Sequence, residues 1–293
     1  MALSRVHEAA DVPAEVAREL GESFELVASV DGADGVIVTP AVTVDGAYLD
    51  AAGPQLRIVA NYAVGIDNVD LQAARERGVV VTNTPGVLTN ATAEHALGLM
   101  LALLRRIAEG DRSLRRHDAW EWGPDFMVGE GLEGARVLVV GPGRIGRRVA
   151  ELVEALGASV AFRGRGDDLL GLLADADVVT LHCPLTPQTR HLIDATALEA
   201  MKPTSILVNT ARGPVVDEGA LVRALLEGSL AGAALDVFEF EPAVSQELLA
   251  LETVVLTPHV ASATRDTRLA MGMLCVSALR AVLLEERTPP NAV

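Results

Sequence analysis

Short runs of valine, isoleucine and leucine alternate with helical segments along almost the whole chain, and this alternation limits the possible folds most strongly. Examples of the runs are GVIVTP, GVVVTNTPG, RVLVVG, DVVTLHCP and SILVNTARG. Continuous apolar runs of this length are typical of strands buried on both faces of a parallel sheet. Between them, AEVARELGE, DLQAARERG and EGALVRALLEG carry apolar residues at roughly helical spacing. The pattern predicts a doubly wound α/β fold.

Two blocks can be distinguished in the chain, and its length of 293 residues suits two domains better than one. Residues 1–92 contain several strand–helix units without a glycine fingerprint, and a long apolar helix, about 93–107, leads out of them. The last helical stretch, 265–285, can return to the first block. We therefore expect one discontinuous domain, residues 1–92 plus 268–293, with a second domain, residues 93–267, inserted into it.

The composition argues against several classes of partner. The net charge is −16 at pH 7, so nucleic acid and anionic membranes are not expected partners. The two cysteines, Cys183 and Cys275, lack metal-ligand spacing, and neither a disulfide nor a metal site is expected. The N-terminal residues lack a continuous apolar segment, and no apolar stretch has the length of a membrane span. These features predict a reduced, cytoplasmic protein.

A glycine-rich loop, GPGRIG, lies between the strand-like run RVLVV and a helical segment. This context makes the loop much more specific for a dinucleotide than the glycine pattern alone. We expect Gly141 to allow the tight turn, Gly143 to let a phosphate approach the backbone, and Gly146 to let the helix pack on the strand. The free N–H groups of the helix would then bind the pyrophosphate. A tight turn without a ligand is the alternative.

The end of the next strand indicates which nicotinamide cofactor is used. NAD sites usually carry Asp or Glu about 20 residues after the glycine loop, to hold the ribose 2′-hydroxyl. Here the strand ends in Arg163, Gly164 and Arg165, and the next acids are Asp167 and Asp168. Guanidinium groups form charged, bidentate bonds to phosphate. We therefore expect NADP(H) to be preferred, with NAD(H) possible if the arginines are only solvated loop charges.

Polar residues follow three later strand-like runs: Arg212 in NTARGP, Glu241 in LDVFEFEP and His259 in LTPHVAS. Because the carboxyl ends of parallel strands line the ligand crevice of an open sheet, we expect these residues to meet. Arginine can clamp a carboxylate and polarise a carbonyl, histidine can deliver a proton near neutral pH, and glutamate can orient that histidine. Singly, each has an ordinary structural explanation. Together, downstream of a cofactor loop, they predict hydride transfer to a small keto acid.

Longer motifs cover nearly the whole chain, among them VANYAVGIDNVD, VVGPGRIGRRVA, MKPTSILVNTARGPVVDEGAL and VVLTPHVASAT. On these motifs the chain resembles the D-isomer-specific 2-hydroxyacid dehydrogenases, and within them the glyoxylate and hydroxypyruvate reductases. The resemblance implies two Rossmann-like domains, of which the discontinuous, flavodoxin-like one holds the substrate. It places backbone groups of Val64 and Gly65, together with Arg212, on the substrate. The further cofactor contacts that it implies are Thr92, Arg144, Ile145, Cys183, Pro184, Thr189, Thr210, Ala211, Asp236 (on the carboxamide) and Ser262.

The activity that the resemblance implies is reduction of glyoxylate, hydroxypyruvate or a similar 2-keto acid to the D-2-hydroxy acid, with His259 as acid/base and Glu241 as its partner. It also implies a homodimer through the cofactor domain, to which residues 93–107 and an arm at 120–126 would contribute. The segment 163–176 is short for the family, which allows for the loss of a helix or strand there. Two alternatives stay open: action on another 2-hydroxy acid, such as phosphoglycerate or a larger keto acid, and a non-catalytic NAD(P)-sensing role like that of corepressors with this fold.

Overall fold

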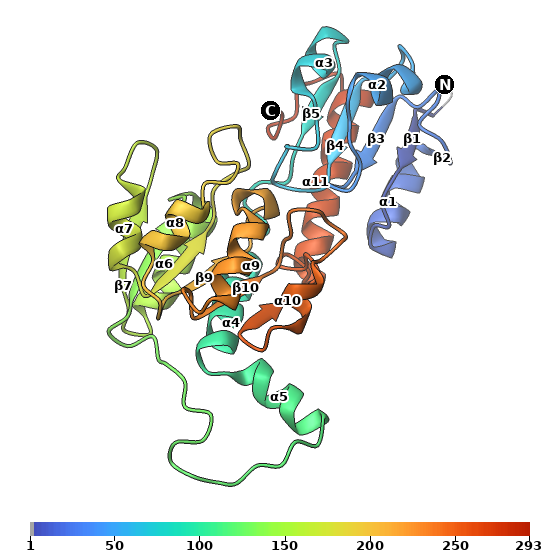
Figure 1. Cartoon of the computed structure of the whole chain (residues 1–293). Coiled ribbons are helices and arrows are strands. Elements are labelled where there is room, and N and C mark those ends of the chain that lie inside the picture. The colour runs from blue at the N-terminus through green and yellow to red at the C-terminus, as the bar shows by residue number, and fades with distance from the viewer. Residues whose placement is uncertain (1–2) are drawn as a thin grey trace. The chain divides into compact units, whose positions relative to one another are not determined.

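The computed structural model describes residues 3–293, and the chain divides into two compact units. The first unit is Met1–Leu88 with Ser262–Val293, and the second is Thr89–Ala261. Each unit is built on one parallel sheet with helices packed against it (Figure 1). The predicted α/β class with a discontinuous first unit is therefore confirmed. The two units divide at 88/89 and 261/262, and the domain boundaries expected from the sequence are 92/93 and 267/268.

The sheet of the first unit has five parallel strands in the order β2-β1-β3-β4-β5. This is the flavodoxin-like order, in which the sheet grows in both directions from its first strand. The elements of this unit are β1 (Arg5–Glu8), α1 (Ala14–Ser23), β2 (Glu25–Val27), β3 (Gly35–Val38), α2 (Gly46–Ala52), β4 (Ile58–Asn61), α3 (Leu71–Glu76), β5 (Val80–Thr82) and α11 (Arg265–Leu283).

The C-terminal helix α11 belongs to the first unit because it packs on that unit's sheet and on α1. Two glycines allow the close approach. A Cβ atom at Gly35 would lie 2.7 Å from Leu279, and one at Gly272 would lie 2.4 Å from Val16. Leu279 and Val16 are both fully buried. The predicted single helix over 265–285 is therefore confirmed, and its packing explains the discontinuous unit.

The sheet of the second unit has six parallel strands in the order β11-β10-β9-β8-β6-β7. The order reverses at β6, so the loop after β6 lies at the switch point where open α/β sheets bind ligands. The elements are α4 (Thr89–Leu104), α5 (Ile107–Arg115), β6 (Arg136–Val140), α6 (Arg144–Glu154), β7 (Ser159–Arg163), α7 (Leu169–Asp175), β8 (Val178–Leu181), α8 (Ala195–Ala200), β9 (Ile206–Asn209), the 3-10 turn η1 (Gly213–Val215), α9 (Glu218–Leu226), β10 (Gly232–Leu235), α10 (Gln246–Ala250) and β11 (Val254–Leu256).

Short polar side chains begin most of the helices after strands. Each accepts a hydrogen bond from a backbone N–H of the first turn, which would otherwise lack a partner within the helix. The capping residues with such a bond are Asp45, Asp70, Asp168, Asp194, Asp217, Ser245 and Thr264. The caps fix where each helix starts, and so they also fix the length of the loop at each strand end.

Two segments differ from the expectations drawn from the sequence. A single helix was expected at about 93–107. The structure instead has α4, which ends at Leu104, and a second helix, α5, which follows from Ile107 after a left-handed residue, Arg106. The short segment 163–176 still contains a helix: β7 leads through residues 164–168 directly into α7. None of the helices within residues 3–293 is both long and apolar enough to cross a membrane.

Candidate active site

The ends of the six strands in the second unit lie in register, and this sets the geometry of the site. Strand pairing aligns Arg163, Val140, Leu181, Asn209, Leu235 and Leu256 across the sheet. The residues that follow this row therefore share one edge. The glycine loop comes after β6, and the loops that contain Arg212, Glu241 and His259 come after β9, β10 and β11.

The glycine loop has the geometry that each of its glycines was expected to provide. Gly141 has φ of 102°, in the region that favours glycine, and a Cβ there would lie 2.7 Å from the backbone of Cys183. A Cβ at Gly146 would lie 2.2 Å from the carbonyl oxygen of Gly141, so the first turn of α6 packs directly on the loop. A Cβ at Gly143 would meet nothing within 4 Å. The loop thus leaves open space at the N-terminus of α6.

Arg163 ends the edge strand β7, and its guanidinium is only partly satisfied. The Nε atom is buried and has no hydrogen-bond partner among residues 3–293. The two nearby acids already accept backbone bonds: Asp167 accepts from the N–H of Gly164 at 2.7 Å, and Asp168 caps α7. Arg165 is exposed in the same loop. This strand end therefore carries basic side chains, whereas its carboxylates are occupied locally.

His259 and Glu241 lie in hydrogen-bond contact, as their positions after neighbouring strands led us to expect. The Nδ1 atom of His259 is 2.8 Å from Glu241 Oε2. Because a carboxylate can only accept, Nδ1 donates and Nε2 is the ring nitrogen left to exchange a proton. Burial raises the pKa of Glu241, but the bonds from His259 and from the Phe238 N–H outweigh it and hold the pKa below its usual value. Glu241 is thus ionised beside His259.

Arg212 occupies the loop between β9 and η1, next to the loop of Glu241. Its charge also lowers the pKa of Glu241, and its Nη1 donates to the Ala211 carbonyl at 2.8 Å. The following residue, Gly213, packs directly on the other loop, because a Cβ there would lie 1.8 Å from the carbonyl oxygen of Phe238. No side chain fits in that space. The Arg212 and Glu241 loops therefore hold one another in place.

Asp236 is fully buried directly behind His259 and accepts several hydrogen bonds. Its donors are the Thr257 hydroxyl at 2.6 Å and the N–H groups of Val260 and Ala261, each at 2.8 Å. His95 of α4 lies 3.3 Å from the carboxylate and 3.0 Å from the Thr257 hydroxyl. Burial raises the pKa of Asp236, but these donors lower it below its usual value. The carboxylate thereby fixes the backbone around His259.

His95 and Thr257 were not among the residues predicted for the site. The signal that could have identified His95 is its position, since it is the last polar residue before the apolar run 96–104 of helix α4. The predicted contact of Asp236 with a carboxamide differs from the hydrogen bonds described above, and it stays a prediction.

Several of the other predicted cofactor residues lie near the same strand ends. Thr210 follows β9, and its buried hydroxyl has no hydrogen-bond partner among the described residues. The Thr189 hydroxyl donates to the Pro184 carbonyl at 2.7 Å and so shapes the loop after Cys183. Desolvation lowers the pKa of His182 to about 4, so this histidine is neutral and is not a candidate proton donor. Thr92 is buried within α4, and Ser262 is the first residue of the returning segment of the first unit.

The loop after β4 in the first unit contains Val64 and Gly65. Side-chain amides hold both of their carbonyl groups: Asn83 donates to Val64 at 2.9 Å, and Asn61 donates to Gly65 at 2.7 Å. Their N–H groups donate to no backbone carbonyl within residues 3–293. Unpaired N–H groups on a loop with fixed carbonyls are suited to bind an anion.

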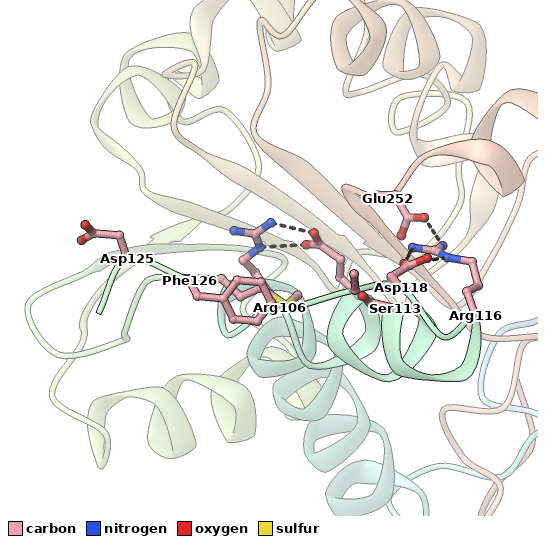
Figure 2. A pocket seen from close by; sticks show the side chains of 10 residues that line it. Arg106, Ser113, Arg116, Asp118, Asp125, Phe126 and Glu252 are labelled. Carbon is pink, nitrogen blue, oxygen red and sulfur yellow. Dashed lines mark hydrogen bonds and ion pairs between the residues drawn. The ribbon is translucent and has the colours of Figure 1, made fainter. Parts of the chain in front are cut away.

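A separate cavity of about 360 Å³ lies on the second unit where α5 meets residues 118–127 (Figure 2). Its charged side chains are paired with one another: Arg106 with Glu109 at 2.6 Å, and Arg116 with both Asp118 and Glu252. Asp125, Phe126 and Met127 complete the lining. None of the predicted catalytic residues lines this cavity, and both of its arginines are held in ion pairs, so it supplies no group for the chemistry at the strand ends.

Comparison with known proteins identifies the class to which this fold and site belong. The model of the family described as D-isomer specific 2-hydroxyacid dehydrogenase, NAD binding domain, matches residues 97–261. The chain belongs to this family of oxidoreductases.

Three relatives illustrate the family. A glyoxylate reductase of Aeropyrum pernix is 47% identical, over 82% of this chain and 77% of the relative. A hydroxyphenylpyruvate reductase of Plectranthus scutellarioides is 45% identical, over 81% of this chain and 78% of the relative. The structure of an NADPH-dependent glyoxylate/hydroxypyruvate reductase of Sinorhizobium meliloti, in complex with NADP and malonate, superimposes with a TM-score of 0.88 at 36% identity, covering 99% of this chain and 96% of that one.

Proposed function

We propose that this protein reduces glyoxylate, hydroxypyruvate or a closely similar 2-keto acid to the D-2-hydroxy acid with NADPH. The observation that carries the proposal is the hydrogen bond of 2.8 Å between His259 and Glu241, at the end of the sheet that also presents Arg212 and the glycine loop. Relatives named glyoxylate reductase support the substrate class.

The roles of the side chains follow from their chemistry. Reduction of a keto acid requires that its carboxylate and carbonyl are held and that a proton reaches the oxygen as negative charge develops there. Arg212 presents a permanently charged fork that suits the carboxylate and the carbonyl. His259 donates the proton from Nε2, while Glu241 on Nδ1 stabilises the charged ring. The nicotinamide, when bound, supplies the hydride.

The residues at the strand ends fit a dinucleotide. Gly143 borders open space at the N-terminus of α6, where N–H groups and the helix dipole favour a pyrophosphate. Two buried polar groups, Arg163 Nε and Thr210 Oγ1, have no protein partner within the described part of the chain. Buried polar groups in native proteins nearly always have a partner. A bound cofactor would provide one for each.

We further infer that NADPH is preferred over NADH. Arg163 and Arg165 provide positive charge at the end of β7, where a ribose 2′-phosphate would need it. The acids that could hold a 2′-hydroxyl instead, Asp167 and Asp168, already accept backbone N–H groups. The relative solved with NADP supports the same preference.

Replacing both arginines by alanine is expected to raise KM for NADPH by about 100-fold or more, because each removes a charge-assisted contact of about 1.5–3 kcal/mol. KM for NADH should change much less. The measurement is nicotinamide absorbance in parallel assays with the two cofactors. Arg148→Ala is the matched control, since Arg148 pairs with Glu151 on α6 and leaves β7 untouched. A wild-type preference for NADH would overturn the inference and leave the reductase assignment intact.

The substrate side chain is tested by comparing glyoxylate, hydroxypyruvate and hydroxyphenylpyruvate under the same conditions. The N–H groups of Val64 and Gly65 are proposed to hold the carboxylate that all three share, so they do not separate the candidates. A kcat/KM for the aromatic keto acid above that for the two small ones would move the assignment to the larger substrate. Tight NADPH binding without turnover of any keto acid would favour a sensing role instead.

We also infer a homodimer that forms through the second unit. Exposed apolar side chains occur on α5, on the arm (residues 120–126) and directly after it. Trp122 is 87% exposed, and Leu114 and Val128 are each 61% exposed, whereas such side chains are usually covered in a stable assembly. Trp120 and Phe126 stack with ring centroids 6.0 Å apart. A second copy of the chain, presenting the same surface through a twofold axis, would cover these residues.

Replacing Trp120 and Trp122 together by serine is expected to convert the dimer to a monomer, because aromatic side chains dominate interface energies. Sedimentation velocity at several protein concentrations measures this change. Leu226→Ser is the control, since Leu226 is 61% exposed on α9, outside the arm. If the wild-type chain sediments as a monomer throughout, the dimer proposal is wrong.

Cys183 and Cys275 are both free and buried, which supports the cytoplasmic location that we infer.

A further inference from the structure

A second histidine–glutamate pair lies next to the proposed catalytic one and has no role in the chemistry described above. His191 Nε2 is 2.6 Å from Glu239 Oε1. The Glu239 side chain is 9% exposed and His191 is 39% exposed. Glu239 precedes Glu241 by two residues in the loop after β10. The pair is therefore placed to act on the conformation of that loop.

Glu239 is fastened to helix α9 through both its backbone and its side chain. Its N–H donates to Glu218 Oε2 at 2.9 Å, and the Glu218 N–H donates back to Glu239 Oε2 at 3.2 Å. Glu218 is the first residue of α9, after the cap Asp217, so the Glu239 carboxylate also lies at the favourable end of the helix dipole. The reciprocal bonds leave little freedom for the loop at this residue.

Phe238, the residue before Glu239, connects this constraint to Glu241. The N–H of Phe238 donates to Glu241 Oε1 at 2.9 Å, and the other oxygen of that carboxylate binds His259. The next peptide, between Phe238 and Glu239, rests against Gly213, where no side chain fits. A shift of Glu239 would thus displace the Phe238 N–H and with it the carboxylate that orients His259.

His191 is anchored independently of Glu239. Its N–H donates to the Pro214 carbonyl at 2.8 Å, and Ile193 forms a parallel bridge with Val216. The segment that contains His191 follows the loop after β8, whereas Pro214 and Val216 follow β9. Because the backbone of His191 is held in this way, its imidazole can hold the Glu239 carboxylate in place.

We propose that His191 and Glu239 form a clip that positions Glu241 for its hydrogen bond to His259. The His191–Glu239 clip joins the loops after β8, β9 and β10, and it is a positioning element, since neither residue is assigned to substrate or cofactor. The inference rests on the proposed function in one respect: His259 is the proton donor and Glu241 is its partner. Arg190 lies 3.7 Å from Glu239 but is 57% exposed, so its charge is largely screened by solvent.

The pH profile gives a readout that a purely structural role would not change. The reaction requires ionised Glu241, so activity is present above the pKa of Glu241 and is lost as pH falls through it. The bonds from His259 and from the Phe238 N–H lower this pKa. Loss of the clip would weaken them and raise the pKa of Glu241. The acid limb of kcat would then move to higher pH.

The test is His191→Asn with His117→Asn as its matched control. Both histidines have left-handed backbone, with φ of 50° and 60°, which asparagine tolerates, and His117 is exposed outside the site and before the arm. We expect His191→Asn to lower kcat by about 10-fold through misplacement of the proton donor, with KM for the keto acid within about twofold of wild type. The acid limb should move to higher pH, and hydrogen exchange at 236–242 should accelerate. His117→Asn should match wild type.

Glu239 provides an internal comparison. Glu239→Ala should reproduce the effect of His191→Asn, whereas Glu239→Gln keeps an acceptor for the Glu218 N–H and should recover most of kcat. The proposal is overturned if His191→Asn and Glu239→Ala both keep wild-type kcat and acid limb, even if exchange increases. Should the wild-type chain reduce no keto acid, the proposed function fails separately. The clip is then decided by exchange alone: accelerated exchange at 236–242 in both variants supports it, and unchanged exchange overturns it.

Discussion

Replacing His259 by asparagine is expected to lower kcat for keto-acid reduction by about 10²- to 10⁴-fold, the usual contribution of a positioned general acid. The Kd for NADPH should stay within about twofold of wild type, because His259 is assigned to the substrate oxygen and not to the cofactor. Asparagine suits the test because residue 259 has φ of 52°, a conformation that asparagine tolerates. Single-turnover absorbance measurements and a fluorescence titration with NADPH give the two quantities.

His117→Asn is again the control, since it makes the same change at another left-handed position. A variant that loses cofactor affinity as much as it loses turnover would contradict the role given to His259. A variant with wild-type turnover would remove the proton-donor assignment altogether, and the bond to Glu241 would then be structural.

Replacing Arg212 by glutamine is expected to affect substrate binding as well as the chemical step. The side chain would lose its charge and its fork, so two charge-assisted contacts of about 1.5–3 kcal/mol each would be lost, and kcat/KM should fall by about 10³-fold or more. KM for the keto acid should rise and kcat should fall, whereas His259→Asn should change mainly kcat. Steady-state kinetics over a wide range of keto-acid concentration distinguishes these patterns.

Arg223→Gln is the control for Arg212, because it removes an exposed arginine from α9 of the same unit. Arg212→Lys adds a second comparison, since lysine keeps the charge without the fork. If lysine restores full activity, charge alone is sufficient and the bidentate role is wrong. If Arg212→Gln leaves KM unchanged, the residue acts only in the chemical step.

The fold was predictable because its signal is repeated along the chain. The apolar runs quoted in the sequence analysis form parallel strands. The parallel pairing of these strands then determines which strand ends lie next to one another. The row that aligns Arg163, Asn209 and Leu235 follows from that pairing. The positions of Arg212, Glu241 and His259 after neighbouring strand ends were therefore predictable from their spacing, and their catalytic roles stay predictions.

The partners of these residues were not accessible in the same way. His95 contacts Asp236 from a helix far earlier in the sequence, and His191 contacts Glu239 across two loops. Such contacts depend on side-chain directions and loop conformations, which the apolar pattern does not specify. The helix α5 was not among the expected elements: it is nine residues long and buries none of them, so it adds nothing to the core pattern from which the fold was predicted.

The order of strands in the second sheet separates two properties of the enzyme. Arg163 ends the edge strand β7, whereas Glu241 and His259 follow β10 and β11 at the opposite end of the six-strand order. Residues without shared partners usually contribute independently. Substitutions at the end of β7 could therefore change which coenzyme is used while the His259–Glu241 pair stays unchanged. Selection on the supply of each coenzyme and selection on catalysis could then act separately.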